Sequence, residues 1–201
     1  MPAPSVPSVI EQPVAQIRPD FIVGFVGHRF LDDAGAPAIH AAIVAHLEQL
    51  KKNKTLLAIS SAAIGADLLF AQATLETKIP LHVYLPFPEA EFRADFSEQD
   101  WPHAKRILEQ AASVIVNRGH TTPPPAGKTP EDSARRSLAY ADCARRIVDA
   151  SDILLAVWDG KPARGHGGAQ ESIAYAKSLG KRLIIINATP RTPCSQNPTS
   201  T

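Results

Sequence analysis

Six short and almost continuous apolar runs recur along the chain, and stretches with helical spacing separate them. The runs span residues 21–28, 55–60, 80–87, 113–118, 152–159 and 181–188. Uninterrupted apolar runs of this length are typical of parallel strands that are covered on both faces. In the stretch 39–52, which separates the first two runs, Ile39, Ile43, Leu47 and Leu50 fall on one helical face.

The other stretches predict further helices, which begin near Gly65 and Trp101 and span about 130–149 and 169–180, with a short helical turn before Trp101. Six strands that alternate with helices predict an α/β fold. We expect a single Rossmann-like three-layer domain with a mainly parallel sheet of about six strands. The 201 residues suit one such domain. The expected boundaries are a Pro-rich N-terminal arm at 1–19, the domain at 20–189 and a polar C-terminal tail at 190–201.

Composition narrows the function classes. The formal net charge of +1 counts against nucleic acid as a partner, because proteins that bind the phosphate backbone normally carry a basic excess. Cys143 and Cys194 lie far apart in the sequence, so a disulfide framework is not expected and a reducing cytoplasm fits best. No apolar run approaches the roughly 20 residues that span a bilayer, and the N-terminus lacks the pattern of a signal peptide.

Several motifs are missing from the sequence. It contains no GxxxxGK[ST], which excludes a P-loop, and the first apolar run lacks GxGxxG, which counts against a dinucleotide-dependent dehydrogenase. No cysteine, histidine and carboxylate cluster has metal-ligand spacing. We therefore expect no metal and no cofactor.

The most informative stretch is the turn after the fifth run, which we call loop three (residues 159–168). Four glycines fall within nine residues, at Gly160, Gly165, Gly167 and Gly168, and a helix follows. A glycine-rich turn before a helix directs backbone N–H groups and the positive end of the helix dipole at an anion, most often a phosphate.

Two carboxylates flank this turn. Asp159 ends the preceding apolar run, so we expect it to face the crevice at the carboxyl ends of the strands, where a ligand would bind. Glu171 falls in the first turn of the helix. It either complements the helix dipole or contacts a ribose or acts in acid–base chemistry.

Two other loops also follow strands. Loop one (residues 27–29) is Gly27-His28-Arg29, and loop two (residues 60–67) includes Ser60, Ser61, Gly65, Ala66 and Asp67. Gly27 lets the chain turn close to a ligand, and loop two combines small residues and hydroxyls with a second helix start. The carboxyl ends of parallel strands share one edge of the sheet, so the three loops should meet in one crevice.

Two side chains in these loops have alternative interpretations. Arg29 either makes a forked contact to a phosphate or carboxylate, or pairs with Asp32 or Asp33 on the surface. Asp67 either complements the dipole of the second helix or binds ribose hydroxyls.

Arg135, Asp142 and Arg146 return to nearly the same angle on the helix expected at 130–149. Such a set forms either a solvated face with salt bridges or a basic rim to the site.

Taken together and in this order, GFVGHR, SSAAIGADLLFAQATLETKIPLHVYLPFP and VDASDILLAVWDGKPARGHGGAQESIAYAKSLGK resemble the SLOG superfamily, over about residues 21–188. This Rossmann-like group includes the Lonely Guy phosphoribohydrolases, the Smf family of DNA-processing proteins and nucleotide-sensing domains. The resemblance implies a nucleotide-derived ligand, with its phosphate held by loop three and its base or ribose near loops one and two. Carried over by position, it points to Gly27, His28, Arg29, Ser60, Ser61, Gly65, Asp67, Gly167, Gly168 and Glu171.

The chain departs from this pattern in two places. Ser61 stands where many relatives have glycine, which narrows the pocket, and the hydrolases have a PGGxGTxxE-like turn where this chain has GHGGAQES. The second departure counts against hydrolysis and leaves binding intact.

The leading hypothesis is a sensor or ligand-binding domain for a nucleotide-derived small molecule, such as an ADP-ribose-like signal. It would act through a homo-oligomer or a separate effector protein. The alternative is an N-glycosidase or phosphoribohydrolase that acts on nucleoside monophosphates with Glu171 as its catalytic carboxylate. A single-stranded DNA binder is the least favoured reading.

Overall fold

The structure, a computed structural model, describes residues 19–32, 34–117, 129–161 and 168–188. The Pro-rich arm apart from Pro19, the polar tail with Cys194, and two predicted site residues, Gly165 and Gly167, lie outside the described residues.

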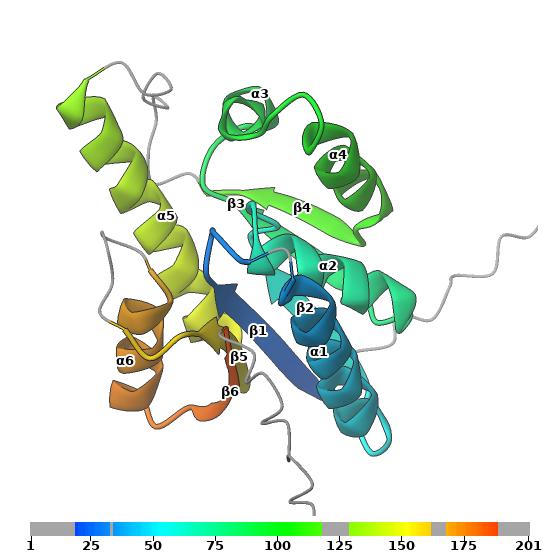
Figure 1. The fold of residues 1–201 in the computed structure, drawn as a ribbon. Coiled ribbons are helices and arrows are strands. Elements are labelled where there is room, and N and C mark those ends of the chain that lie inside the picture. Colours follow the sequence, from blue (N-terminus) through cyan, green and yellow to red (C-terminus); the bar gives the residue numbers. More distant parts are fainter. Residues whose placement is uncertain (1–18, 33, 118–128, 162–167, 189–201) are drawn as a thin grey trace, which may run out of the picture.

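The described residues form one sheet of six strands, all of whose pairings are parallel (Figure 1). Its order is β4-β3-β2-β1-β5-β6. The strands are β1 (Phe21–Gly27), β2 (Leu56–Ser60), β3 (Leu81–Leu85), β4 (Ser113–Val116), β5 (Ile153–Trp158) and β6 (Arg182–Asn187). The chain runs outward from β1 to β4 and then returns to place β5 on the other side of β1. The order therefore reverses between β1 and β5, and the predicted mainly parallel α/β sheet is confirmed.

Helices cover both faces of this sheet. The apolar cluster on one face includes residues of α1 (Ala36–Lys51), α2 (Ala66–Glu76) and α4 (Trp101–Gln110), and the clusters on the other include residues of α5 (Pro130–Ala150) and α6 (Ala169–Ser178). Successive residues of β1 point to opposite faces of the sheet. Phe25 therefore packs into the first cluster and Val26 into one of the clusters on the other face.

The amino-acid sequence explains where several of the helices begin. Proline occupies one of the first two positions of α1, α4 and α5, where its missing N–H costs no helical bond. Thr129 caps α5 by accepting a hydrogen bond from the Asp132 backbone N–H. The predicted stripe of α1 is buried at Ile39, Ile43 and Leu47. The expected short helical turn before α4 consists of α3 (Glu89–Phe92) and the 3-10 helix η1 (Arg93–Asp95).

The start of α2 packs directly against the end of β1, and two glycines make this possible. Gly65 has φ +93°, and a Cβ there would lie 2.3 Å from the Arg29 carbonyl oxygen. A Cβ on Gly27 would lie 2.4 Å from the Cβ of Ala66. The Ala66 backbone N–H donates to the His28 carbonyl across this junction at 3.0 Å. Loops one and two are therefore joined through backbone atoms.

We expect Gly65→Ala to lower the free energy of unfolding by about 3 kcal/mol or more, since it adds both a backbone clash and an unfavourable φ. Gly160→Ala is the matched control, because Gly160 also has a positive φ of +81° but open space around its Cβ position. The control should lose only about 1–2 kcal/mol, the cost of the left-handed backbone alone. Urea unfolding of the two variants tests this, and equal losses would contradict the packing argument.

Candidate functional site

A cavity of about 460 Å³ opens at the carboxyl edge of the sheet, where the strand order reverses between β1 and β5. Residues of all three loops line it, together with one face of α5. The predicted residues among its lining are Gly27, His28, Arg29, Ser61, Asp67, Asp159 and Gly168. The expectation that Gly27 and Gly168 share one crevice is therefore met.

Other predicted site residues lie elsewhere. Ser60, Gly65, Ala66, Gly160 and Glu171 are not among the described residues that line the cavity. Ser60 and Ala66 are fully buried. The first N–H of α2 is taken by the His28 carbonyl, so this helix start closes a junction inside the fold.

Asp67 joins the ends of β1 and β2. Its carboxylate accepts hydrogen bonds from the hydroxyls of Ser61 at 2.8 Å and Ser60 at 3.3 Å, and the backbone N–H groups of Ser61 and Gly27 also point to it. Burial raises the pKa of Asp67 to about 7, although these hydrogen bonds act in the opposite direction. Asp67 does stand in the first turn of α2, but its partners are loop two and the end of β1.

His28 and Asp159 connect β1 with β5. Gly27 is in register with Val157, so the residues that follow the two strands meet. His28 Nε2 lies 3.0 Å from both the Asp159 carboxylate oxygen Oδ1 and the Asp159 backbone nitrogen. A ring with an unprotonated Nε2 accepts from the backbone N–H, and a ring with a protonated Nε2 donates to the carboxylate.

The Asp159 carboxylate is fixed from a second side. The Lys161 backbone N–H donates to its Oδ1 at 2.9 Å. This hydrogen bond, followed by the nearby His28, lowers the pKa of Asp159. Asp159 is therefore an ionised, preoriented acceptor at the edge of the cavity.

The helix that follows loop three begins at the cavity. Gly168, Ala169 and Gln170 line it, and Gly168 forms the start of α6 without a side-chain cap. The positive end of the α6 dipole is thus directed at the cavity. Glu171 is one residue further along, is exposed and is not among the described residues that line the cavity.

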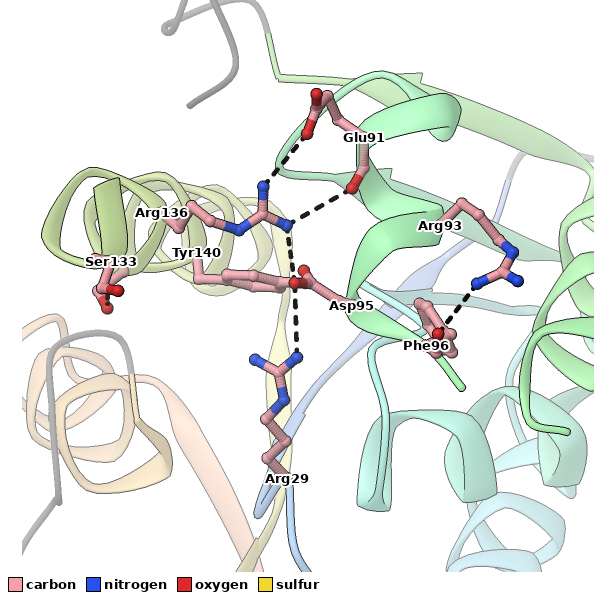
Figure 2. A network of polar contacts seen from close by, with 9 residues as sticks. Arg29, Glu91, Arg93, Asp95, Phe96, Ser133, Arg136 and Tyr140 are labelled. Atoms are coloured by element: carbon pink, nitrogen blue, oxygen red, sulfur yellow. Dashed lines mark hydrogen bonds and ion pairs between the residues drawn. The ribbon is translucent and has the colours of Figure 1, made fainter. Parts of the chain in front are cut away.

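Arg29 belongs to a polar network that the sequence did not indicate (Figure 2). Its Nη2 lies 3.8 Å from Asp95 Oδ1, and its guanidinium lies 5.7 Å from the centre of the Tyr140 ring. The alternative of a surface pair with Asp32 does not hold, because Arg29 lies beside Asp95 and the Asp32 carboxylate accepts from the Ala34 backbone N–H. Asp33, the other partner considered, lies outside the described residues.

Sequence reasoning also missed Arg136. Its side chain is 9% exposed, and it pairs with Asp95 at 2.7 Å and with Glu91 at 3.4 Å. The usable signal was its spacing of four from Tyr140, which places it on the buried side of α5. Tyr140 donates to Asp95 Oδ2 at 2.5 Å and lines the cavity.

The predicted face of α5 turns out to be divided. Arg135 and Asp142 are exposed, whereas Arg146 is half-buried. Arg146 donates to Asn117 Oδ1 at 2.9 Å and lies over the Tyr84 ring. None of the three lines the cavity. The alternative of a basic rim therefore does not hold for this cavity.

Within the described ranges, no three histidine, cysteine or carboxylate side chains gather closely enough to hold a metal ion. In the same ranges, no helix combines the length and apolarity needed to cross a membrane.

No protein-family model matches the chain, and no curated protein matches it in sequence. Among solved structures, DNA processing protein A (DprA) from Streptococcus pneumoniae superposes with a TM-score of 0.54 at 14% identity, over 86% of this chain and 52% of that protein. DprA from Helicobacter pylori, whose structure is described in terms of its single-stranded DNA binding mode, gives 0.54 at 16% identity, over 86% and 67%. The structural-genomics target TM1055 gives 0.48 at 14%, over 81% and 72%.

The chain thus spans about half the length of the Streptococcus pneumoniae protein. At these identities the likeness shows the fold alone, and this fold agrees with the Rossmann-like fold that the sequence resemblance implied.

The raised pKa of Asp67 predicts a pH dependence of stability. Because its folded-state pKa of about 7 exceeds the usual aspartate pKa of 3.8, its contribution to stability is fully present below about pH 4 and is lost as the pH rises through 7. Asp67→Asn stays neutral and should lack this loss. The free energy of unfolding of wild type should fall relative to the variant by on the order of a few kcal/mol between about pH 4 and 8. Urea titrations across that range measure the difference, and parallel profiles would show that Asp67 ionises normally.

Proposed function

We propose that the cavity binds a nucleotide-derived small molecule, such as an ADP-ribose-like signal, and that the domain serves as a sensor or ligand-binding domain. The observation that carries this proposal is the convergence of loops one, two and three on one cavity at the point where the strand order reverses. Ligands of open parallel α/β sheets characteristically bind at that point. A volume of about 460 Å³ lies within the range of roughly 300–1,000 Å³ that small-molecule sites occupy.

The lining suits a ligand with an apolar ring system and a polar part. Ile64, Tyr140 and Trp158 offer apolar and aromatic surface, whereas Ser61 and Asp159 offer hydrogen-bonding groups. A base would pack against the first set and a ribose would bond to the second.

A phosphate would lie near the start of α6. The helix dipole favours an anion there, and the side chains of Lys161 and Arg29 add positive charge around the same cavity. This assignment agrees with the resemblance, which places the phosphate at loop three.

Single-stranded DNA binding is the second candidate, because the fold is shared with DprA and one DprA structure is described by that activity. The charges in the cavity favour the small molecule. Asp32 and Asp159 accompany Arg29 and Lys161 in its lining, whereas single-strand grooves carry a marked positive excess. The overall charge of +1 points the same way.

An N-glycosidase remains the enzymatic alternative. Its expected catalytic carboxylate, Glu171, is exposed and outside the cavity lining, so no observed geometry places it beside a glycosidic bond. We also propose that the sensor acts through a homo-oligomer or a separate effector protein. The proposed location is the cytoplasm.

Gly168→Asp should abolish binding of ADP-ribose in calorimetry, because it places a negative side chain at the start of α6. Ala174→Asp is the matched control: it adds the same charge to an exposed position on the same helix, away from the cavity. This control should bind as wild type does.

Unchanged affinity in Gly168→Asp would refute the phosphate role of this helix start. If wild type binds a short oligothymidylate with strong salt dependence and does not bind ADP-ribose, the DNA-binding candidate replaces the small-molecule proposal.

Incubation with purine and pyrimidine nucleoside monophosphates should release no free base, as measured by chromatography. In a hydrolase, Glu171→Gln would instead lose about 10²-fold or more of the rate while keeping affinity, the scale of general acid–base catalysis. Base release by wild type that disappears in this variant would establish the enzymatic alternative.

A further inference from the structure

Four charged side chains alternate in sign from the cavity to α3. Arg29 comes first, followed by Asp95, Arg136 and Glu91 (Figure 2). The successive closest contacts are 3.8 Å, 2.7 Å and 3.4 Å. The cavity end of this charge ladder is positive, and the carboxylate of Asp95 stands directly behind it.

Asp95 is the fixed member of the ladder. Its side chain is 12% exposed and is held by Arg136 at 2.7 Å and by the Tyr140 hydroxyl at 2.5 Å. Burial and the Asp95 charge raise the pKa of Tyr140 well above its usual value, so the phenol remains a neutral donor. Both contacts hold the carboxylate in place.

Arg29 is the loosely held member. Its side chain is 43% exposed, and 3.8 Å exceeds the length of a charge-assisted hydrogen bond. The contact therefore constrains the guanidinium only weakly, and an anion in the cavity can take its forked donors without breaking a short bond.

We propose that Asp95 determines the charge of the phosphate that the cavity accepts, selecting a monoanionic phosphodiester or pyrophosphate bridge over a terminal dianionic monoester. This inference rests on the proposed function. A phosphate oxygen bonded to Arg29 Nη2 lies within about 7 Å of Asp95 Oδ1, because such bonds are about 2.8 Å long. At that distance a second negative charge on the phosphate is repelled appreciably in a partly screened site.

The rest of the lining carries more negative than positive side chains. Asp32, Asp67 and Asp159 contribute three further carboxylates, and Lys161 contributes one cation besides Arg29. Arg136 lies on the far side of Asp95 from Arg29 and pairs with Asp95 and Glu91, so it adds little positive charge to the cavity. The ligand class that fits is a nucleotide whose phosphates are all esterified or bridging.

The test compares AMP with its 5′-monomethyl ester, two ligands that differ by one methyl group and, above the second phosphate pKa of about 6, by one charge. Calorimetry at about pH 7.5 gives both dissociation constants for wild type, Asp95→Asn and Glu91→Gln. Wild type should prefer the ester. Asp95→Asn should shift the ratio towards AMP by about fivefold or more, the scale of one charge pair at this distance.

Glu91→Gln is the control, because it removes the same charge from the far end of the ladder and should shift the ratio by less than about twofold. Equal affinity of wild type for both ligands, or equal shifts in the two variants, overturns the inference and leaves the binding proposal standing. Binding of neither ligand by wild type overturns both. Should Asp95→Asn fail to fold, as judged by circular dichroism, the wild-type preference alone decides: ester over AMP supports the inference, and the reverse overturns it.

Discussion

The buried carboxylate of Asp67 is the interaction on which the architecture of the site depends. It collects hydrogen bonds from Ser60, Ser61 and the end of β1 at Gly27, and so ties two strand ends to the first turn of α2. Such a group is costly to bury unless its bonds are made, which favours one arrangement of these three segments over all others. The close approach at Gly27 and Gly65 follows from the same junction. Loop two is therefore a rigid wall of the cavity.

The opposite wall is built from β5, and its connection to β1 is of a different kind. The register between the strands brings His28 beside Asp159, and a single ring nitrogen reaches both the carboxylate and the backbone N–H. The glycines on the two sides of the cavity also differ in what requires them. Gly27 and Gly65 are required by packing, whereas Gly160 has open space around it and serves only the turn after β5. Buried hydrogen bonds and close packing fix one side of the cavity, and the partly exposed His28–Asp159 contact shapes the other.

The sequence predicted the parts of the site that depend on periodicity. Apolar runs located the strands, and because parallel strands end at one edge, the convergence of three loops followed from order alone. The sequence could not pair Arg29 with Asp95, since that partner lies 66 positions away in η1, a segment without a regular pattern. The charge of Arg136 favours an exposed position, whereas its spacing of four from Tyr140 places the two side chains on the same face of α5. Phase also separates Gln170, which lines the cavity, from the exposed Glu171.

These two walls also constrain how a ligand would be oriented. Asp67 already accepts several internal hydrogen bonds and, with a pKa of about 7, carries only part of its charge at neutral pH. The O–H of Ser61 is itself donated to Asp67, so loop two offers a ligand an acceptor lone pair of the Ser61 oxygen and the apolar surface of Ala63 and Ile64, which suits a base or ribose. The groups that could attract an anion, namely Arg29, Lys161 and the start of α6, all belong to loops one and three. A bound nucleotide would therefore extend across the strand-order reversal, with its base towards β2 and its phosphate towards β5.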